Sequence, residues 1–139
     1  MANIAEKELE LSRKRMDRFF RLMYEFPEKK NFYQYYAQYN WLRASDWQIR
    51  IWLVQLGNLL EDFNSGIIDK TEVDSQITTI KNQLVQLMSG IQTTGKLASK
   101  RRWRVKEYGT MKKWIRAIYG RVARVRKLMK QLDNLVKGF

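Results

Sequence analysis

A dense run of cations over residues 100–106 is the feature of this sequence that most directly suggests chemistry. Five of its seven residues are basic: Lys100, Arg101, Arg102, Arg104 and Lys106. On a solvated helix these like charges repel one another. Phosphate groups relieve that repulsion, and arginine forms paired hydrogen bonds with phosphate oxygens. The run therefore predicts contact with a polyanion, and the alternative is a charged helix face that contacts only solvent.

The net charge of the chain is concentrated in its last third. The 139 residues include 27 Lys or Arg and 14 Asp or Glu, which gives a formal net charge of +13. Residues 1–95 are neutral as a group, so the whole excess lies in residues 96–139. Beyond the run at 100–106, the candidate phosphate-binding residues of this part are Lys112, Lys113, Arg116, Arg124 and Lys127. Such an excess points first to nucleic acid as the partner.

A second group of cations lies in the neutral part of the chain. It comprises Arg13, Lys14, Arg15, Arg18 and Arg21, offset only by Asp17. We interpret this group as a further candidate nucleic-acid contact. The alternatives are a surface helix face, or pairing with the acidic residues 61–74 of another subunit.

The residue types that catalysis and metal binding most often use are missing. The chain contains no cysteine and no histidine, which excludes thiolate chemistry, the commonest general base and classical zinc sites. Residues 61–72 match part of a calcium loop, but Phe63 stands where an oxygen ligand is required. We therefore expect no catalytic residue, metal, cofactor or small-molecule substrate, and a protein that is not an enzyme.

The pattern of apolar residues predicts an all-α fold, a bundle of about four to five helices. Its first helix covers residues 3–26 and ends at Pro27, since proline interrupts a helix. We divide the chain into an N-terminal basic helical arm at residues 1–27 and a helical bundle at residues 28–139. A long basic C-terminal helix, over residues 97–137, has an apolar stripe centred on Ile118 and its cations on the other side.

Helix boundaries within the bundle follow from caps and glycines. Ser45 and Gln48 resemble a capping box, so a new helix is expected at residue 46, with one continuous helix as the alternative. That helix should end at Gly66, and another should start at Asp69. We place the end of the helix that starts at Asp69 at about residue 92, before the sequence Thr-Thr-Gly that finishes at Gly95.

Aromatic residues crowd into residues 32–52, which contain eight of them. Aromatic side chains interleaved with arginine can stack unpaired bases, but Arg43 and Arg50 are the only cations between residues 31 and 60. We therefore interpret the aromatic residues as core and subunit interface. Their separation from the cations favours binding to a duplex backbone over stacking on a single strand.

In architecture and composition the whole chain resembles the major capsid proteins of filamentous archaeal viruses. The residues that carry the resemblance are the arginine-bearing group from Arg13 to Arg21, the break at Pro27 and the basic helix that extends to Lys130. In that family, paired capsid subunits wrap double-stranded DNA and their N-terminal helices embrace it. The resemblance implies a sequence-independent DNA-packaging role in a virion, with this chain or a homologous capsid subunit as the protein partner. Glu6, Glu8 and Glu10 depart from that picture, because carboxylates are unfavourable beside phosphate.

Two other classes remain open at this point. One is a basic helical nucleic-acid-binding accessory protein of the cell that does not form a capsid. The other is a membrane-surface or matrix-type protein that places its last helix on anionic lipid. Membrane contact is not favoured, because the apolar stripe of that helix is needed inside the bundle. The N-terminal residues lack the apolar core of a secretory signal, so outside a virion we expect a cytoplasmic protein.

Overall fold

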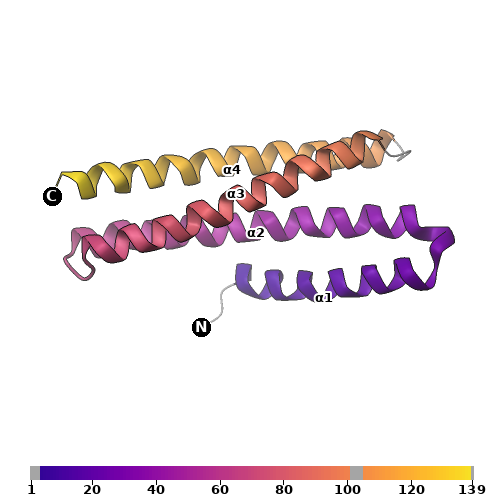
Figure 1. Ribbon diagram of the computed structural model, residues 1–139, viewed down its shortest axis with the longest axis horizontal. Coiled ribbons are helices and arrows are strands. Elements are labelled where there is room, and N and C mark those ends of the chain that lie inside the picture. The colour runs from indigo at the N-terminus through magenta and orange to yellow at the C-terminus, as the bar shows by residue number, and fades with distance from the viewer. Residues whose placement is uncertain (1–3, 101–104, 139) are drawn as a thin grey trace.

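The computed structural model describes residues 4–100 and 105–138, with the side chains of residues 96–100 and 105–108 left out. The chain forms α1 (Ile4–Glu25), the short 3-10 helix η1 (Pro27–Lys29), α2 (Lys30–Asn64), α3 (Lys70–Lys100) and α4 (Val105–Lys137). The helices run up and down along one long axis (Figure 1). The predicted all-α helical bundle is confirmed.

The corner between α1 and α2 forms at Pro27, as the sequence predicts. Proline has no backbone N–H to continue the α1 ladder, and it occupies the first position of η1, where none is needed. The backbone N–H of Phe26 still donates to the carbonyl of Leu22 at 2.9 Å, so α1 is hydrogen-bonded up to the corner. The chain then reverses, and α1 lies antiparallel to the N-terminal half of α2 (Figure 1).

The predicted helix start at residue 46 is wrong, and the alternative of one continuous helix is confirmed. The hydroxyl of Ser45 donates to the carbonyl of Trp41, one turn earlier, at 2.9 Å. It therefore does not cap a new helix, and α2 continues for 35 residues. A serine inside a helix satisfies its hydroxyl in this way when the surrounding packing favours the helix.

The turn between α2 and α3 follows the sequence prediction. Gly66 has a φ of +74°, a left-handed conformation that glycine adopts without steric cost, and it ends the helix. The side chain of Asp69 accepts a hydrogen bond from the backbone N–H of Glu72 at 2.9 Å, which caps the start of α3.

The predicted end of α3 near residue 92 is wrong, because the helix continues through Gly95 to Lys100. The hydroxyl of Thr94 is buried and donates to the side-chain oxygen of Gln38 on α2 at 2.8 Å. A Cβ atom added at Gly95 would lie 3.9 Å from Ile115 of α4. These two residues thus pack α3 against its neighbours. The predicted start of the last helix at residue 97 is wrong, because residues 97–100 belong to α3, and the described part of α4 starts at Val105.

The hydrophobic core lies between α2, α3 and α4. The apolar stripe predicted for the last helix is buried, with Met111, Ile118, Val125 and Leu132 at most 1% exposed. On α2 the core side carries Leu42, Ile49 and Leu56, spaced by seven residues and fully buried.

The other side of α2 receives α1. The side-chain amide of Asn40 donates to the backbone carbonyl of Ser12 at 2.8 Å, and both residues are buried. Ala37, one turn before Asn40, is 1% exposed. The N-terminal half of α2 is therefore covered on two opposite sides, by α1 and by the α3–α4 pair.

We predict that Gly90→Ala destabilises the protein, because a Cβ atom at this position would lie 2.7 Å from the indole ring of Trp41. Forcing α3 and α2 apart should lower the free energy of unfolding by about 1–3 kcal/mol, the usual cost of overpacking. Gly120→Ala is the matched control, since nothing lies within 4 Å of the added carbon. In an exposed helix this second change should stabilise by up to about 1 kcal/mol. Urea unfolding of both variants checks this, and equal stability would contradict the close approach of Trp41 to α3.

Candidate functional site

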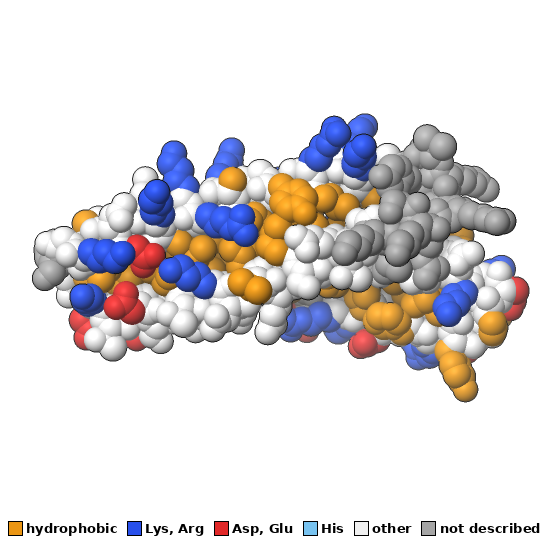
Figure 2. Space-filling model, turned by 45° about the horizontal axis from the view of Figure 1, so that its top comes forward, with side chains coloured by type: hydrophobic (Ala, Val, Ile, Leu, Met, Phe, Trp, Pro, Cys, Tyr) orange, Lys and Arg blue, Asp and Glu red, His pale blue; other side chains and the backbone are white. Residues whose placement is uncertain are grey.

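A row of exposed cations runs along the outer side of α4. Of the residues predicted from the sequence, Lys112, Lys113, Arg116, Arg124 and Lys127 are all exposed. Lys and Arg side chains line the edge of the molecule that α4 forms (Figure 2). From Lys112 to Lys127 the row is about 23 Å long at ~1.5 Å per residue. We call these five residues the α4 row.

Arg126 and Lys137 are further cations of α4 that the sequence analysis did not select. Arg126 is exposed and Lys137 ends the helix, and Lys130, to which the basic helix was expected to extend, is exposed as well. Within the described part of α4, Asp133 is the only acidic residue whose side chain is placed, and it pairs with Lys81 of α3 at 3.2 Å. The outer side of α4 therefore has a strong excess of positive charge, and the helical spacing of the sequence was sufficient to find these residues.

The cationic run at residues 100–106 lies mostly outside the described residues. Arg101, Arg102 and Arg104 lie outside the described residues, and so do the side chains of Lys100 and Lys106. The backbone of Lys100 ends α3 and that of Lys106 lies in the first turn of α4. The run is therefore at the connection between these two helices.

The five cations of α1 that the sequence predicts as contacts are all exposed: Arg13, Lys14, Arg15, Arg18 and Arg21. Among the described residues, α1 packs against α2 and η1 but makes no close backbone approach to α4. In the described part of the chain, the cations of α1 and the α4 row therefore lie on either side of α2.

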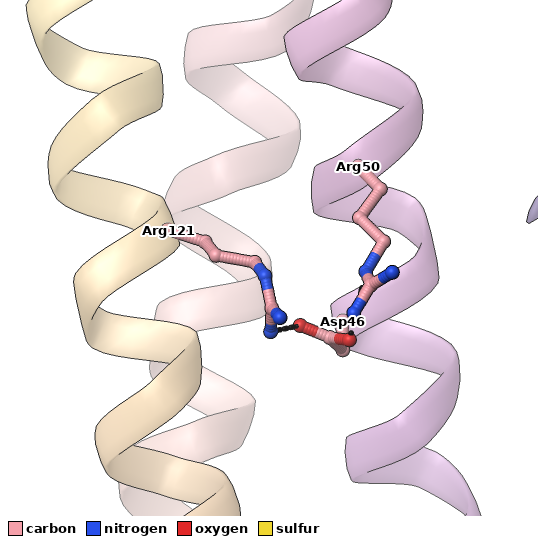
Figure 3. Close-up of polar contacts among 3 residues, drawn as sticks. All are labelled: Asp46, Arg50 and Arg121. Carbon is pink, nitrogen blue, oxygen red and sulfur yellow. Dashed lines mark hydrogen bonds and ion pairs between the residues drawn. The ribbon is translucent and has the colours of Figure 1, made fainter.

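A buried carboxylate links α2 to α4, and the sequence analysis did not find it. The side chain of Asp46 is 3% exposed and pairs with Arg50 of its own helix at 3.2 Å and with Arg121 of α4 (Figure 3). A lone aspartate among aromatic residues carries no sequence signal for such a pairing. Because both neighbours are arginines, the single negative charge of Asp46 is overcompensated.

A partly exposed stripe on α2 lies between the two basic helices. It comprises residues spaced by three, four or seven positions, which share one side of a helix: Phe32, Tyr36, Arg43, Trp47, Arg50 and Val54. At the α1 side of the stripe, Tyr36 stacks on Phe19 with ring centroids 6.2 Å apart. At the α4 side, Arg50 shares Asp46 with Arg121. We call these six residues the α2 stripe.

Only some of the aromatic residues of α2 belong to the core, and others are exposed. Tyr35 and Trp52 are buried, and Tyr39 and Trp41 pack against the core from its edge. Phe32 is 56% exposed and Tyr36 41%. The separation of aromatic residues from cations, which the sequence indicates, does not hold in space, because α1 and α4 bring arginines to both sides of the α2 stripe.

Two grooves flank α1. One has a volume of about 420 Å³ and lies between α1 and α3, with Trp41 and Trp52 of α2 among its lining residues and Arg13 on α1. The other, of about 430 Å³, is lined by Glu6 of α1, Val54 and Asp62 of α2 and the first turns of α3. Within the described residues, no three carboxylate side chains gather in a group that would hold a metal ion.

No protein-family model, curated protein or solved structure matches this chain. In the described part of the chain, no helix combines the length and the apolar character needed to cross a bilayer. Any functional assignment therefore depends on the charge and the geometry of the chain's own residues.

We predict that Asp46→Asn lowers the free energy of unfolding by about 2 kcal/mol or more, since the carboxylate is buried and its loss leaves Arg121, on another helix, without a counter-charge. Asp133→Asn is the matched control, because its pair with Lys81 is solvated on both sides. An exposed pair contributes about 0–1 kcal/mol. Chemical unfolding of the two variants measures the difference, and an equal loss in both would show that Asp46 does not link α2 to α4.

Proposed function

We propose that this protein packages nucleic acid as a structural component, by binding the phosphates of double-stranded DNA without sequence preference and assembling along it into a helical nucleocapsid. On this proposal it is the major capsid protein of a filamentous virus and part of the virion. The observation that carries the proposal is the α4 row, five exposed cations along one helix. The fold fits this role because the apolar stripe of α4 is buried in the bundle, which leaves its cationic side for a ligand.

The composition of the α4 row favours phosphates over bases as the ligand. Its members are lysines and arginines spread over more than four turns, and no Asn or Gln is interleaved with them. Sequence-specific proteins read base edges with a compact group of side chains that includes such amides. A long row of cations instead matches the regular charge of a duplex, one negative charge per about 1.7 Å of helix axis. This argument supports binding that is independent of sequence.

Assembly follows from the size of the chain and the distribution of its charge. One bundle of this size covers only a short piece of duplex, so complete coverage needs many copies. The net charge of +13 opposes close packing of free subunits, and phosphates neutralise it. Exposed apolar side chains on two helices, such as Phe20 of α1 and Val85 of α3, are available for contacts between subunits. DNA binding and assembly are therefore coupled in this proposal.

The first test is the salt dependence of duplex binding. We expect the affinity of the protein for a short duplex to fall steeply with salt, with a log–log slope of about 0.9 per phosphate neutralised. In the variant Lys113→Gln, Arg116→Gln, Lys127→Gln, the slope should be lower by about 2–3 and equal for unrelated duplexes. The control replaces Lys7, Lys30 and Lys70, which are exposed on other helices, with glutamine. Equal slopes for the two triple variants, or a strong preference for one sequence, would overturn the role of the α4 row.

The second test is cooperativity on long DNA. We expect the protein to form small species alone and long assemblies when it is titrated with duplex DNA of several hundred base pairs. Light scattering should therefore rise sigmoidally with long duplex, and only weakly with a short duplex at the same phosphate concentration. If binding to long duplex instead saturates as isolated small complexes, the capsid proposal fails and a nucleic-acid-binding accessory protein takes its place.

A further inference from the structure

The α2 stripe combines flat aromatic side chains and arginines on a surface that no other described helix covers. Phe32 and Val54 are more than half exposed, and Tyr36 is 41% exposed. Arg43 and Trp47 are half-buried, so they form the floor of this surface between α1 and α4. The guanidinium of Arg50 lies over the ring of Trp47, 4.9 Å from its centroid.

The neighbouring helices add further cations at the edges of the stripe. On α1, Arg15 lies one helical turn before Phe19, the residue that stacks on Tyr36, so it shares the side of α1 that borders the stripe. On α4, Arg121 borders the stripe through its pair with Asp46 (Figure 3). Both basic helices therefore contribute an arginine to one surface.

Negative charge on this surface is scarce. No residue of the α2 stripe is acidic, and the carboxylate of Asp46 beneath it is buried and paired with two arginines. Glu8 of α1, two turns before Arg15, lies at the same border and is half-buried. With Arg15, Arg43 and Arg50 on the same surface, the charge remains positive.

We infer that the α2 stripe is a binding surface for single-stranded or unpaired nucleic acid, distinct from the α4 row. Bases stack on Phe32, Tyr36 and Trp47, and phosphates pair with Arg15, Arg43 and Arg50. Aromatic side chains alternating with cations are the means by which proteins hold unpaired strands without sequence preference. A duplex does not satisfy such a surface, because the faces of its bases are already stacked on one another. The inference goes beyond the proposed function, since duplex packaging uses only backbone phosphates.

A second copy of this chain is the other occupant to consider, since interfaces are also rich in aromatic residues and arginine. Charge argues against it. The net charge of +13 makes two copies repel each other, and a like-charged arginine surface adds to that repulsion, whereas a strand of phosphates cancels it. We therefore favour nucleic acid, and the experiment below distinguishes the two occupants.

The test compares an oligo(dT) strand of about 12 nucleotides with a hairpin duplex of similar charge. Trp47→Leu removes one stacking platform, and we expect it to weaken binding of the strand at least about fivefold, the lower end of the effect of one stacked base. Trp47→Phe keeps an aromatic face and should retain most of the affinity. Phe32→Leu, at a largely exposed position that does not support the core, should weaken strand binding in the same direction. The control is Tyr119→Leu, an exposed aromatic residue of α4 outside the stripe.

The arginines are tested in the same assay. Arg43→Gln should weaken strand binding several-fold and leave hairpin binding near its original value, with Lys70→Gln as the control for the loss of one charge. Unchanged strand binding in both Phe32→Leu and Arg43→Gln would overturn the inference, and so would an equal loss for strand and hairpin. A change in sedimentation of the DNA-free protein, without a change in strand binding, would assign the stripe to a second copy instead. Failure of the α4 triple variant to affect duplex binding would refute the proposed function and would leave this result untouched.

Discussion

The structure depends on one constraint, the need of α2 to be covered on two opposite sides. Leu42, Ile49 and Leu56 form its core side and are completely buried. Ala37 and Asn40, on the opposite side, are buried as well, and Asn40 satisfies its amide on the backbone of Ser12. A helix with two buried sides cannot lie at the edge of a bundle, so α1 must fold back on one side while α3 and α4 cover the other. The α2 stripe is the surface that this arrangement leaves open.

The positions of the exposed cations also follow from the way the helices pack on α2. The apolar side of α4 is used against α2 and α3, which directs the α4 row outward along one edge (Figure 2). The packing of α1 on α2 leaves the five cations from Arg13 to Arg21 exposed on the other side of α2. Where α2 and α4 meet, Asp46 pairs with both Arg50 and Arg121 (Figure 3). The one buried carboxylate of α2 therefore positions two arginines, and its single negative charge does not cancel theirs.

The sequence predicted those features that are local and failed for those that depend on packing. The corner at Pro27 and the cap at Asp69 follow from single residues whose backbone or side chain permits few alternatives. Ser45 and Gly95 carry equally good local signals for helix ends, but the helices continue through both. Leu42 and Ile49, on either side of Ser45, are buried in the same core, and Thr94, beside Gly95, is hydrogen-bonded to α2. The buried side of α4 could also be predicted, because a 3.6-residue period of apolar residues is a local pattern that indicates which side of a helix is buried. The α2 stripe could not be predicted from the sequence, because the arginines at its edges belong to α1 and α4, which are far from it in the sequence.

These observations describe a protein whose folded core leaves two positively charged surfaces open, one a row of cations and the other a mixture of arginine and aromatic residues. We propose that such subunits coat duplex DNA continuously. Electron microscopy of the purified protein mixed with long linear duplex DNA tests this most directly. We expect filaments of uniform diameter that follow the whole length of the DNA, whatever its sequence. Bare DNA with scattered particles, or filaments that form equally well without DNA, would contradict it.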